Sequence, residues 1–500
     1  MTPRGTFALV LHSHLPWLAH HGRWPVGEEW LYQAWGTSYL QVLDVLDRLA
    51  AEGRRDLVTL GVTPVLAAQL DDPYCLDAFA TWLGFWRARS EDLAGDADPE
   101  LRALAGYEFR CATWASDQHA ARGALSDSFR RLADAGAIEV LGGPATHPFQ
   151  PLYPDEVVRA GLRVGLADAV LRRGQRGGGI WAPECGYRPG LEDVYAAEGV
   201  THFMVDGPTF QHVGVQPFAG RTVGDSDVVA FARDLDVTYR VWSPKRGYPS
   251  DPHYRDFHAV HHGSGFRPAR VTSVQTRQED KAPYRPAATA AIVARDAADF
   301  VAVVAARLDA IAERRGAPGL VVAAYDTELF GHWWHEGPQW LEQVLRLLPD
   351  AGVQVTTLAG AAQAGLVDGP VALEPGSWGS GKDWRVWAGT PVADIVADND
   401  KLVRRWLATP RPQGSVRAEV ADQLAREALL ALSSDWAFMV TKDTAAQYAR
   451  VRHDQHHERF HDLADAVAAQ GLEGAAARAL AAADRRGDGP FARLDSRALW

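Results

Sequence analysis

The chain has 500 residues, 47% of them hydrophobic and 23% charged, which is the balance of a globular protein and not of a disordered one. The formal net charge of −12 argues against nucleic acid or an anionic membrane as partner, because both attract basic surfaces. No segment approaches the ~18 consecutive apolar residues of a membrane span, and the three cysteines lack the CxxC spacing of a thiolate metal site. We therefore expect a cytoplasmic protein.

Tryptophan is the compositional exception, with 18 residues. Most tryptophans of a protein belong to its core, but their flat faces also stack on the apolar faces of sugars and bases. Because the chain is acidic, sugar is the favoured ligand class.

The first predicted strand, residues 6–11, leads directly into His12 and His14. Side chains at alternate positions of a strand point the same way, so both imidazoles reach the same end of a barrel. They could ligate a metal or hydrogen-bond a substrate hydroxyl. The second role is favoured, because no third ligand follows at a recognisable spacing. Trp24 comes next, in an aromatic-rich stretch.

Helical spacing of apolar residues predicts a helix over residues 36–53, and residues 57–60 form the second strand candidate. Residues 73–136 then have a helical pattern throughout. This span is too long for an ordinary barrel crossover and indicates an inserted helical domain. The third strand candidate, residues 137–141, ends in a Gly-Gly-Pro turn that is followed by His147.

Two further apolar strand candidates each end in an acidic residue. Residues 179–183 lead into Glu184, and residues 320–325 lead into Asp326. The strands of an α/β barrel point their C-terminal ends at the active site, so these positions favour catalysis over a chance surface acid. Since tryptophans flank both acids, we interpret the pair as two carboxylates that face a sugar. Cys185 adjoins the first acid, but without a histidine or asparagine partner it is a weak candidate nucleophile.

Residues 206–282 are poor in helix and dense in aromatic rings and histidines, as expected of a wall or lid over a barrel mouth. They contain strand candidates at residues 228–231 and 237–242, the second ending in Trp242. Further along, the glycine-rich residues 376–384 lack the spacing of a phosphate-binding loop. The alternation of strands and helices predicts an α/β fold with parallel strands, followed by a helical C-terminal part.

Five short stretches, in this order, make the chain similar to glycoside hydrolase family 57. They are His12-Ser-His-Leu-Pro, Leu141-Gly-Gly-Pro, Trp181-Ala-Pro-Glu-Cys-Gly-Tyr, Ala324-Tyr-Asp-Thr-Glu-Leu-Phe-Gly-His-Trp-Trp and Ser433-Ser-Asp-Trp. One of them alone is a weak signal, but the ordered set, spread over nearly the whole chain, is highly specific. The resemblance implies a distorted (β/α)7-type barrel from residues 1–72 and 137–395, a helical insertion at residues 73–136 and an all-helical C-terminal domain at residues 396–500.

The same resemblance implies the roles of particular residues. Glu184 would be the nucleophile and Asp326 the general acid/base, and no metal or organic cofactor would be required. The positions implied to bind substrate are His12, His14, Trp24, His147, Trp242, Trp378, Trp387 and Asp435. The partner would be an α-glucan such as amylose or a glycogen-like polysaccharide, and the oligomeric state stays open.

The implied activity is retaining glycosyl transfer, in which an α-1,4 bond is cleaved and an α-1,6 branch is formed through a covalent glucosyl-enzyme. Amylase-like hydrolysis of α-1,4-glucan and 4-α-glucanotransfer, both within the same family, are the alternatives. Branching enzymes of the family carry a long loop with a tyrosine between the nucleophile strand and the stretch that corresponds to Trp242. This interval is short here, so hydrolysis stays open.

Retaining chemistry needs two carboxyl groups about 5–5.5 Å apart, one of which attacks the anomeric carbon while the other protonates the leaving oxygen. Asp326 must therefore be protonated at the start. We predict that the tryptophans Trp333 and Trp334 and the charge of Glu184 raise its pKa.

Two other protein classes remain as rivals. A metal-dependent hydrolase on a similar barrel would use His12, His14 and Asp206 as ligands. A catalytically silent glucan-binding protein would keep the tryptophans and need neither acid.

Overall fold

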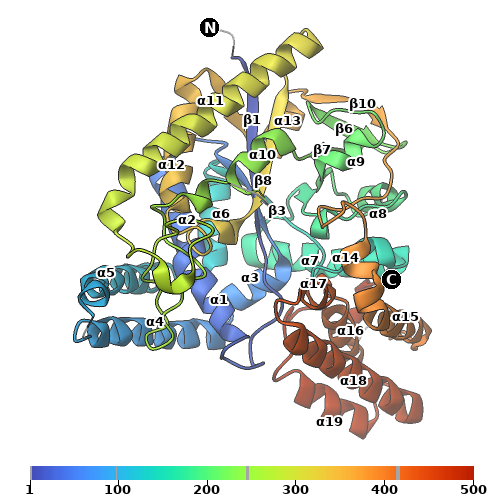
Figure 1. Ribbon diagram of the computed structural model, residues 1–500. Coiled ribbons are helices and arrows are strands. Elements are labelled where there is room, and N and C mark those ends of the chain that lie inside the picture. Colours follow the sequence, from blue (N-terminus) through green and yellow to red (C-terminus); the bar gives the residue numbers. More distant parts are fainter. Residues whose placement is uncertain (1–2, 97, 244–246, 413–416) are drawn as a thin grey trace.

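Two five-stranded sheets form the centre of the computed structural model, which describes residues 3–96, 98–243, 247–412 and 417–500 (Figure 1). The first sheet has the order β3-β2-β1-β8, with β9 also beside β1, and the second has the order β10-β6-β7-β5-β4. The strands are β1 (Gly5–Ser13), β2 (Val58–Val62), β3 (Ile138–Leu141), β4 (Gly179–Ile180), β5 (His202–Val205), β6 (Gly220–Val223), β7 (Val229–Ala232), β8 (Leu320–Asp326), β9 (Val353–Thr356) and β10 (Val367–Val371).

The two sheets join at both edges to form a barrel. A parallel bridge between Gly142 and Ile180 links β3 to β4. The backbone N–H of Asp234 donates to the carbonyl of Val322 at 2.8 Å, which links the end of β7 to β8. Within the two sheets, the neighbours around the ring β1-β2-β3-β4-β5-β7-β8 run parallel. The prediction of a distorted seven-stranded α/β barrel is therefore confirmed.

Strand β1 lies at the centre because its sequence is apolar on both faces. Every residue of the strand is buried, a pattern typical of a parallel strand that is covered on both sides. Its register places His12 beside Gly61 of β2 and beside Asp326 of β8. A histidine and an acid thus come together at the C-terminal end of the barrel, where the functional residues of such barrels lie.

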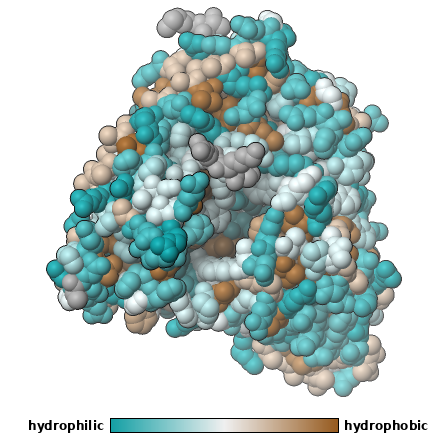
Figure 2. All heavy atoms as spheres, viewed as in Figure 1, coloured by the Kyte–Doolittle hydropathy of each residue, from teal (hydrophilic) through white to brown (hydrophobic). Residues whose placement is uncertain are grey.

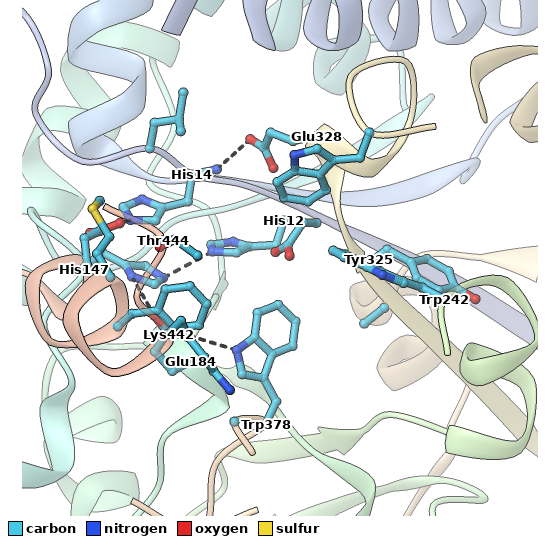
Figure 3. Close-up of a pocket in the computed structure, with 18 of the residues that line it drawn as sticks. His12, His14, His147, Glu184, Trp242, Tyr325, Glu328, Trp378, Lys442 and Thr444 are labelled. Carbon is cyan, nitrogen blue, oxygen red and sulfur yellow. Dashed lines mark hydrogen bonds and ion pairs between the residues drawn. The ribbon is translucent and has the colours of Figure 1, made fainter. Parts of the chain in front are cut away.

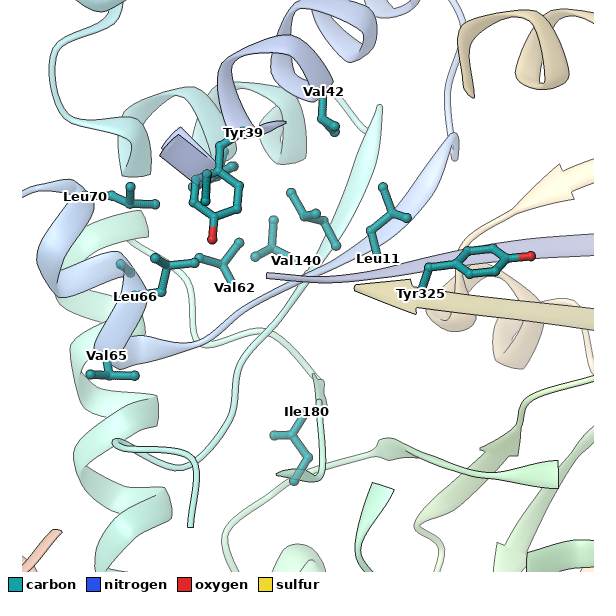
Figure 4. Packing of buried hydrophobic residues seen from close by; sticks show 14 of the residues in the cluster. Leu11, Tyr39, Val42, Val62, Val65, Leu66, Leu70, Val140, Ile180 and Tyr325 are labelled. Carbon is teal, nitrogen blue, oxygen red and sulfur yellow. The ribbon is translucent and has the colours of Figure 1, made fainter. Parts of the chain in front are cut away.

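A ring of helices covers the barrel. Neighbours in this ring contact one another in the order α10 (Leu235–Val241), α11 (Ala290–Arg315), α12 (Gly337–Asp350), α2 (Leu40–Ala51), α6 (Leu125–Asp134), α7 (Asp155–Arg173) and α8 (Leu191–Ala197). Figure 4 shows part of the core beneath them, where Leu11, Val62 and Val140 from three strands lie in one cluster with Val42 of α2. Each such buried aliphatic side chain stabilises the fold by about 1.5–3 kcal/mol relative to its exposed state.

Two long helices, α4 (Pro73–Leu93) and α5 (Pro99–Arg122), pack against each other beside the barrel (Figure 1). Asp72 and Asp98 cap them by accepting backbone N–H groups of the first turn. An ion pair between Arg255 and the buried Glu108 ties α5 to the segment that follows α10. The boundaries of the insertion, residues 73–136, stay a prediction; within that span α6 contacts α2 and α7 of the barrel.

The C-terminal part is helical, as predicted. Its helices are α15 (Ala393–Ala408), α16 (Glu419–Ala431), α17 (Ser434–Lys442), α18 (Ala446–Gln470) and α19 (Ala475–Asp484), and the other four all contact α18. A buried polar cluster ties this part to the N-terminal segment. Asp488 is hydrogen-bonded to His21 at 2.5 Å and lies beside His456, which is hydrogen-bonded to Glu427 at 2.8 Å.

One predicted strand is wrong. Most of residues 237–242 belong to helix α10, because the side chain of Asp234 accepts two backbone N–H groups of the first turn and so starts a helix. The β-branched residues that suggested a strand are buried on one face of this helix instead. Trp242 therefore stands at the C-terminal end of a helix.

Candidate active site

A cleft of about 990 Å³ opens at the C-terminal ends of the barrel strands. Figure 2 shows a hollow near the middle of this face, and Figure 3 shows side chains that line the cleft. The predicted site residues that line it are His12, His14, His147, Glu184, Trp242, Asp326, Trp378, Trp387 and Asp435. Trp24 is not among the described lining residues; its side chain is 71% exposed on the loop before α1 (Glu28–Ala34).

Glu184 stands just after the short strand β4, in a turn with a left-handed backbone. Its φ is 61° and that of Cys185 is 50°, a conformation that is costly for non-glycine residues and recurs at functional sites. Both carboxylate oxygens accept hydrogen bonds. Oε2 accepts from Trp378 Nε1 at 2.9 Å (Figure 3), and Oε1 accepts from Ser434 Oγ at 2.8 Å. The backbone N–H of Trp378 also donates to the carbonyl of Glu184 at 2.9 Å. The carboxylate is therefore fixed in one orientation.

The surroundings of Glu184 raise its pKa to about 7. Burial is the largest cause, because it disfavours the charged form. The hydrogen bonds from Trp378 and Ser434 act in the opposite direction, as does the charge of His14, while the charge of Asp435 adds to the increase. The two donors thus keep part of this carboxyl ionised near neutral pH.

Asp326 is the last residue of β8 and faces the same cleft. Among the described residues no side chain or backbone group hydrogen-bonds its carboxyl, so this group is free to give and take a proton. Burial raises its pKa to about 6, and the charges of Arg233 and His14 oppose the increase. The predicted direction is correct, but the cause is burial and not the charge of Glu184.

Three histidines stack along one wall of the cleft. The ring of His12 lies on Trp181 with centroids 4.2 Å apart, and the rings of His14 and His147 are 3.8 Å apart. Nε2 of His12 is hydrogen-bonded to Nε2 of His147 at 3.1 Å, and Nε2 of His14 is hydrogen-bonded to Asp435 at 2.9 Å.

The charge states of these histidines differ. Burial, together with the charge of His14, lowers the pKa of His12 and that of His147 well below the usual value, so both rings are neutral. Burial also acts to lower the pKa of His14, but the charges of Asp435, Glu184 and Glu328 and the hydrogen bond to Asp435 outweigh it, and that pKa is raised. His14 is therefore the cationic member of the group.

The tryptophans of the cleft are not equivalent. Trp242 is 41% exposed and pairs with Trp333, with ring centroids 5.2 Å apart, so it offers a free aromatic face. Trp378 is partly buried beside Trp181, at 4.9 Å. Trp387 is only 1% exposed and one face is stacked on Phe149 at 4.5 Å, so the cleft meets a small part of it.

Sequence reasoning assigned no role to several residues that the structure brings into contact with the site. Ser434 bonds the Glu184 carboxylate and Trp181 supports His12; both lie within the quoted motifs, but no spacing distinguishes them. Glu328 also lines the cleft. It is buried, accepts from the backbone N–H of His14 at 3.2 Å and from the hydroxyl of Tyr39, and its pKa is raised to about 8 by burial and by the charge of Asp326.

The rival metal site does not assemble from its expected ligands. Asp206 forms ion pairs with Arg233 at 2.8 Å and Lys382 at 2.7 Å. Among the described residues, two other groups have potential ligand atoms within 4.8 Å of one another, namely His14, His147 and Asp435, and Glu427, His456 and Asp488. In each group a histidine is hydrogen-bonded directly to a carboxylate.

Cys185 cannot act as a nucleophile in this state. Its side chain is buried, and burial raises the pKa of the thiol well above the usual value. The reactive thiolate is therefore not formed near neutral pH.

The arrangement suits a double displacement at a sugar carbon. One carboxylate is held by two donors and the other is free, and exposed aromatic rings line the same cleft. Burial raises the pKa of both carboxyls, to about 7 for Glu184 and about 6 for Asp326. In the free protein Glu184 thus holds its proton to the higher pH, whereas a retaining glycosidase reacts from the reverse state, with the nucleophile ionised and the acid protonated.

Comparisons with known proteins agree with this chemistry. A family model described as glycosyl hydrolase family 57 matches residues 8–365, and one described as 1,4-alpha-glucan branching enzyme, C-terminal, matches residues 398–498. A Mycobacterium tuberculosis protein named as a probable 1,4-alpha-glucan branching enzyme is 52% identical, over 99% of this chain and 98% of its own.

Solved structures give the same result. The crystal structure of a GH57-type branching enzyme from Pyrococcus horikoshii has a TM-score of 0.92 at 30% identity and covers 98% of this chain and 96% of that one. An α-amylase from Thermotoga maritima has a TM-score of 0.85 at 25% identity, with 99% of each chain covered. The protein described here therefore belongs to glycosyl hydrolase family 57.

Proposed function

We propose that the protein is a 1,4-α-glucan branching enzyme, which cuts an α-1,4-linked glucan and reattaches the cut segment through an α-1,6 bond. The observation that carries the proposal is the contrast between the two acids. Both oxygens of Glu184 accept hydrogen bonds, whereas the Asp326 carboxyl, in the same cleft, accepts none from the described residues. A fixed carboxylate suits a nucleophile, and a free carboxyl suits a proton carrier.

In the first half of the reaction an oxygen of Glu184 bonds to the anomeric carbon. The bond from this carbon to the leaving O4 breaks, and its electron pair goes to O4, which takes the proton of Asp326. In the second half the 6-hydroxyl of an acceptor glucan gives its proton to Asp326 while its oxygen attacks the same carbon. The bond to Glu184 then breaks and regenerates the carboxylate, and two inversions retain the α configuration.

The remaining predicted residues are proposed to hold the glucan. His12, His14, His147 and Asp435 lie beside Glu184 and suit the hydroxyls of the sugar that is attacked. They form two hydrogen-bonded pairs, His12 with His147 and His14 with Asp435, and the rings of His14 and His147 stack.

Aromatic rings would bind the neighbouring glucose units. Trp242 and Trp378 offer faces on which these units can stack. Trp387 contributes mainly to the wall, and Trp24 suits only a glucan that extends beyond the cleft.

Branching is favoured over hydrolysis within the family. The relative that is 52% identical over nearly the whole chain is named as a branching enzyme, and the C-terminal region matches a branching-enzyme model. The α-amylase is more distant, at 25% identity. Hydrolysis and transfer share the first half-reaction, so the acceptor alone separates them.

Proton NMR of amylose incubated with the purified protein tests the proposal. We expect new α-1,6 anomeric signals without an equal rise in reducing ends, and neither product with Glu184→Gln. Reducing ends without α-1,6 signals would instead identify a hydrolase. Activity that survives in Glu184→Gln would refute the assigned nucleophile.

The proposed compartment is the cytoplasm. Cys75, Cys111 and Cys185 are free thiols, as suits a reducing environment. Within the described ranges, no helix combines the length and the apolar character of a membrane span.

A further inference from the structure

We infer that Ser434 is a positioning residue for the nucleophile. Its hydroxyl links Glu184 to His147 and, through that ring, to His12. This chain of hydrogen bonds favours the ionised form of the Glu184 carboxyl and holds it in one orientation. The inference rests on the proposed function, because it concerns the nucleophile of that reaction.

The backbone fixes Ser434 in place. It is the first residue of α17 and is 3% exposed, and its backbone N–H donates to the carbonyl of His147 at 3.0 Å. The preceding residue, Ser433, forms an antiparallel bridge with Pro148. The start of α17 is thus bound through its backbone to the loop after β3. In this loop His147 has a φ of 59°. Ser434 and His147 cannot move apart without breaking these backbone contacts.

The number of protons on each group fixes the direction of every hydrogen bond in this chain. Ser434 has one hydroxyl proton, which it donates to Glu184 Oε1 at 2.8 Å, so its oxygen must accept from His147 Nδ1 at 2.9 Å. His147 is neutral, because its pKa is lowered well below the usual value. Its Nε2 is then bare and must accept from His12 Nε2, at 3.1 Å. His12 is neutral too and is left with a bare Nδ1.

The far end of the chain agrees with this assignment. His12 Nδ1 is buried and has no hydrogen-bond partner among the described residues. A proton on Glu184 Oε1 would reverse every bond of the chain and place a hydrogen on His12 Nδ1, where no described acceptor receives it. A proton on Oε2 would face the N–H of Trp378 instead. Protonation of either oxygen therefore leaves a hydrogen without an acceptor, which disfavours the protonated form of Glu184.

Other groups also face Glu184, but they do not replace Ser434. The titratable or charged groups around Glu184 and the adjoining Cys185 are His14, His147, Asp435, Asp206, Arg233 and Lys382. His147 Nδ1 lies 3.8 Å from Glu184 Oε1, which is too far for a hydrogen bond. Among the described residues, Ser434 is therefore the one donor to that oxygen.

Ser434→Ala tests the inference, with Ser434→Thr as rescue. The alanine variant is expected to shift the acidic limb of kcat/KM upward by about one pH unit, and thus to lose about tenfold activity on that limb. KM at the plateau is expected to change little, because the hydroxyl faces the nucleophile and not the cleft. Threonine keeps the hydroxyl and is expected to restore the native profile.

The matched control is Thr441→Ala on the same helix. Its hydroxyl donates to the backbone carbonyl of Val386 at 2.7 Å, away from Glu184. The rate at which an activated fluoroglucosyl fluoride labels the protein, followed by intact mass spectrometry against pH, reports the ionised nucleophile directly. A native labelling profile in Ser434→Ala would overturn the inference.

A second measurement does not depend on the folding of the Ser434 variants. Nitrogen-15 NMR of labelled histidines in the native protein, assigned by single substitutions, is expected to find the proton of His147 on Nδ1 and that of His12 on Nε2. The opposite tautomers would overturn the inference. Glu184→Gln separates this failure from failure of the proposed function: if that variant stays active, the nucleophile itself is wrongly assigned.

Discussion

Trp378→Phe is the substitution that isolates one hydrogen bond to the nucleophile while it keeps an aromatic ring in the cleft. The indole N–H donates to Glu184 Oε2 at 2.9 Å. Hydrogen bonds to charged groups contribute about 1.5–3 kcal/mol, and one pKa unit corresponds to about 1.4 kcal/mol, so the full loss would raise the pKa of Glu184 by about one to two units. Water that enters the vacated space restores part of this, and we expect about one unit above the native value of about 7.

The sign of the effect fixes its pH dependence. A carboxyl whose pKa rises is more protonated at a given pH, so the variant is expected to lose about tenfold in kcat/KM below pH 7 and to recover as the pH rises above its new pKa. The assay is the initial rate of α-1,6 bond formation from amylose between pH 5 and 9.

Trp384→Phe is the matched control. It lies on the same glycine-rich loop, and its indole nitrogen is buried without a hydrogen-bond partner among the described residues. This variant is expected to keep the native pH profile. An unshifted acidic limb in Trp378→Phe, or equal shifts in both variants, would refute the reasoning.

Two further predictions concern the other acid and the aromatic wall. Asp326→Asn is expected to lower branching of amylose by about 10²–10⁴-fold, because the leaving oxygen is no longer protonated. Labelling by an activated glycosyl fluoride should persist, since fluoride leaves without a proton; if both activities fall together, Asp326 does not act as the acid. Trp242→Ala is expected to raise KM for amylose by about two- to tenfold, from the loss of one stacking contact of about 0.5–1.5 kcal/mol. Trp24→Ala, outside the cleft, should change KM less, and the reverse order would contradict the placement of the cleft.

The barrel could be predicted because its strands are apolar on both faces and its helices are amphipathic. Residues 6–11 and 320–325 are predicted as strands in this way, and they lie in β1 and β8. The failure at residues 237–242 has a physical reason. Valine and threonine fit a strand or the buried face of a helix equally well, and the deciding signal was the capping side chain of Asp234.

The sequence predicts those residues of the candidate site that lie at the ends of strands. His12 and Asp326 follow from the period of two and from the direction of parallel strands, which bring them side by side. Ser434 could not be found in this way, because its contact with Glu184 joins residues 250 positions apart in the chain. The sequence also could not show that Trp387 is almost fully buried, since composition does not distinguish a buried ring from an exposed one.

The contact between Ser434 and Glu184 also sets the order in which the enzyme becomes competent during its own synthesis. The ribosome releases the chain from the N-terminus, so every strand of the barrel emerges before α17. Until that helix has emerged and docked, the Glu184 carboxylate lacks one of its two donors. We therefore expect a nascent barrel to attack glucan at less than its full rate until α17 has docked.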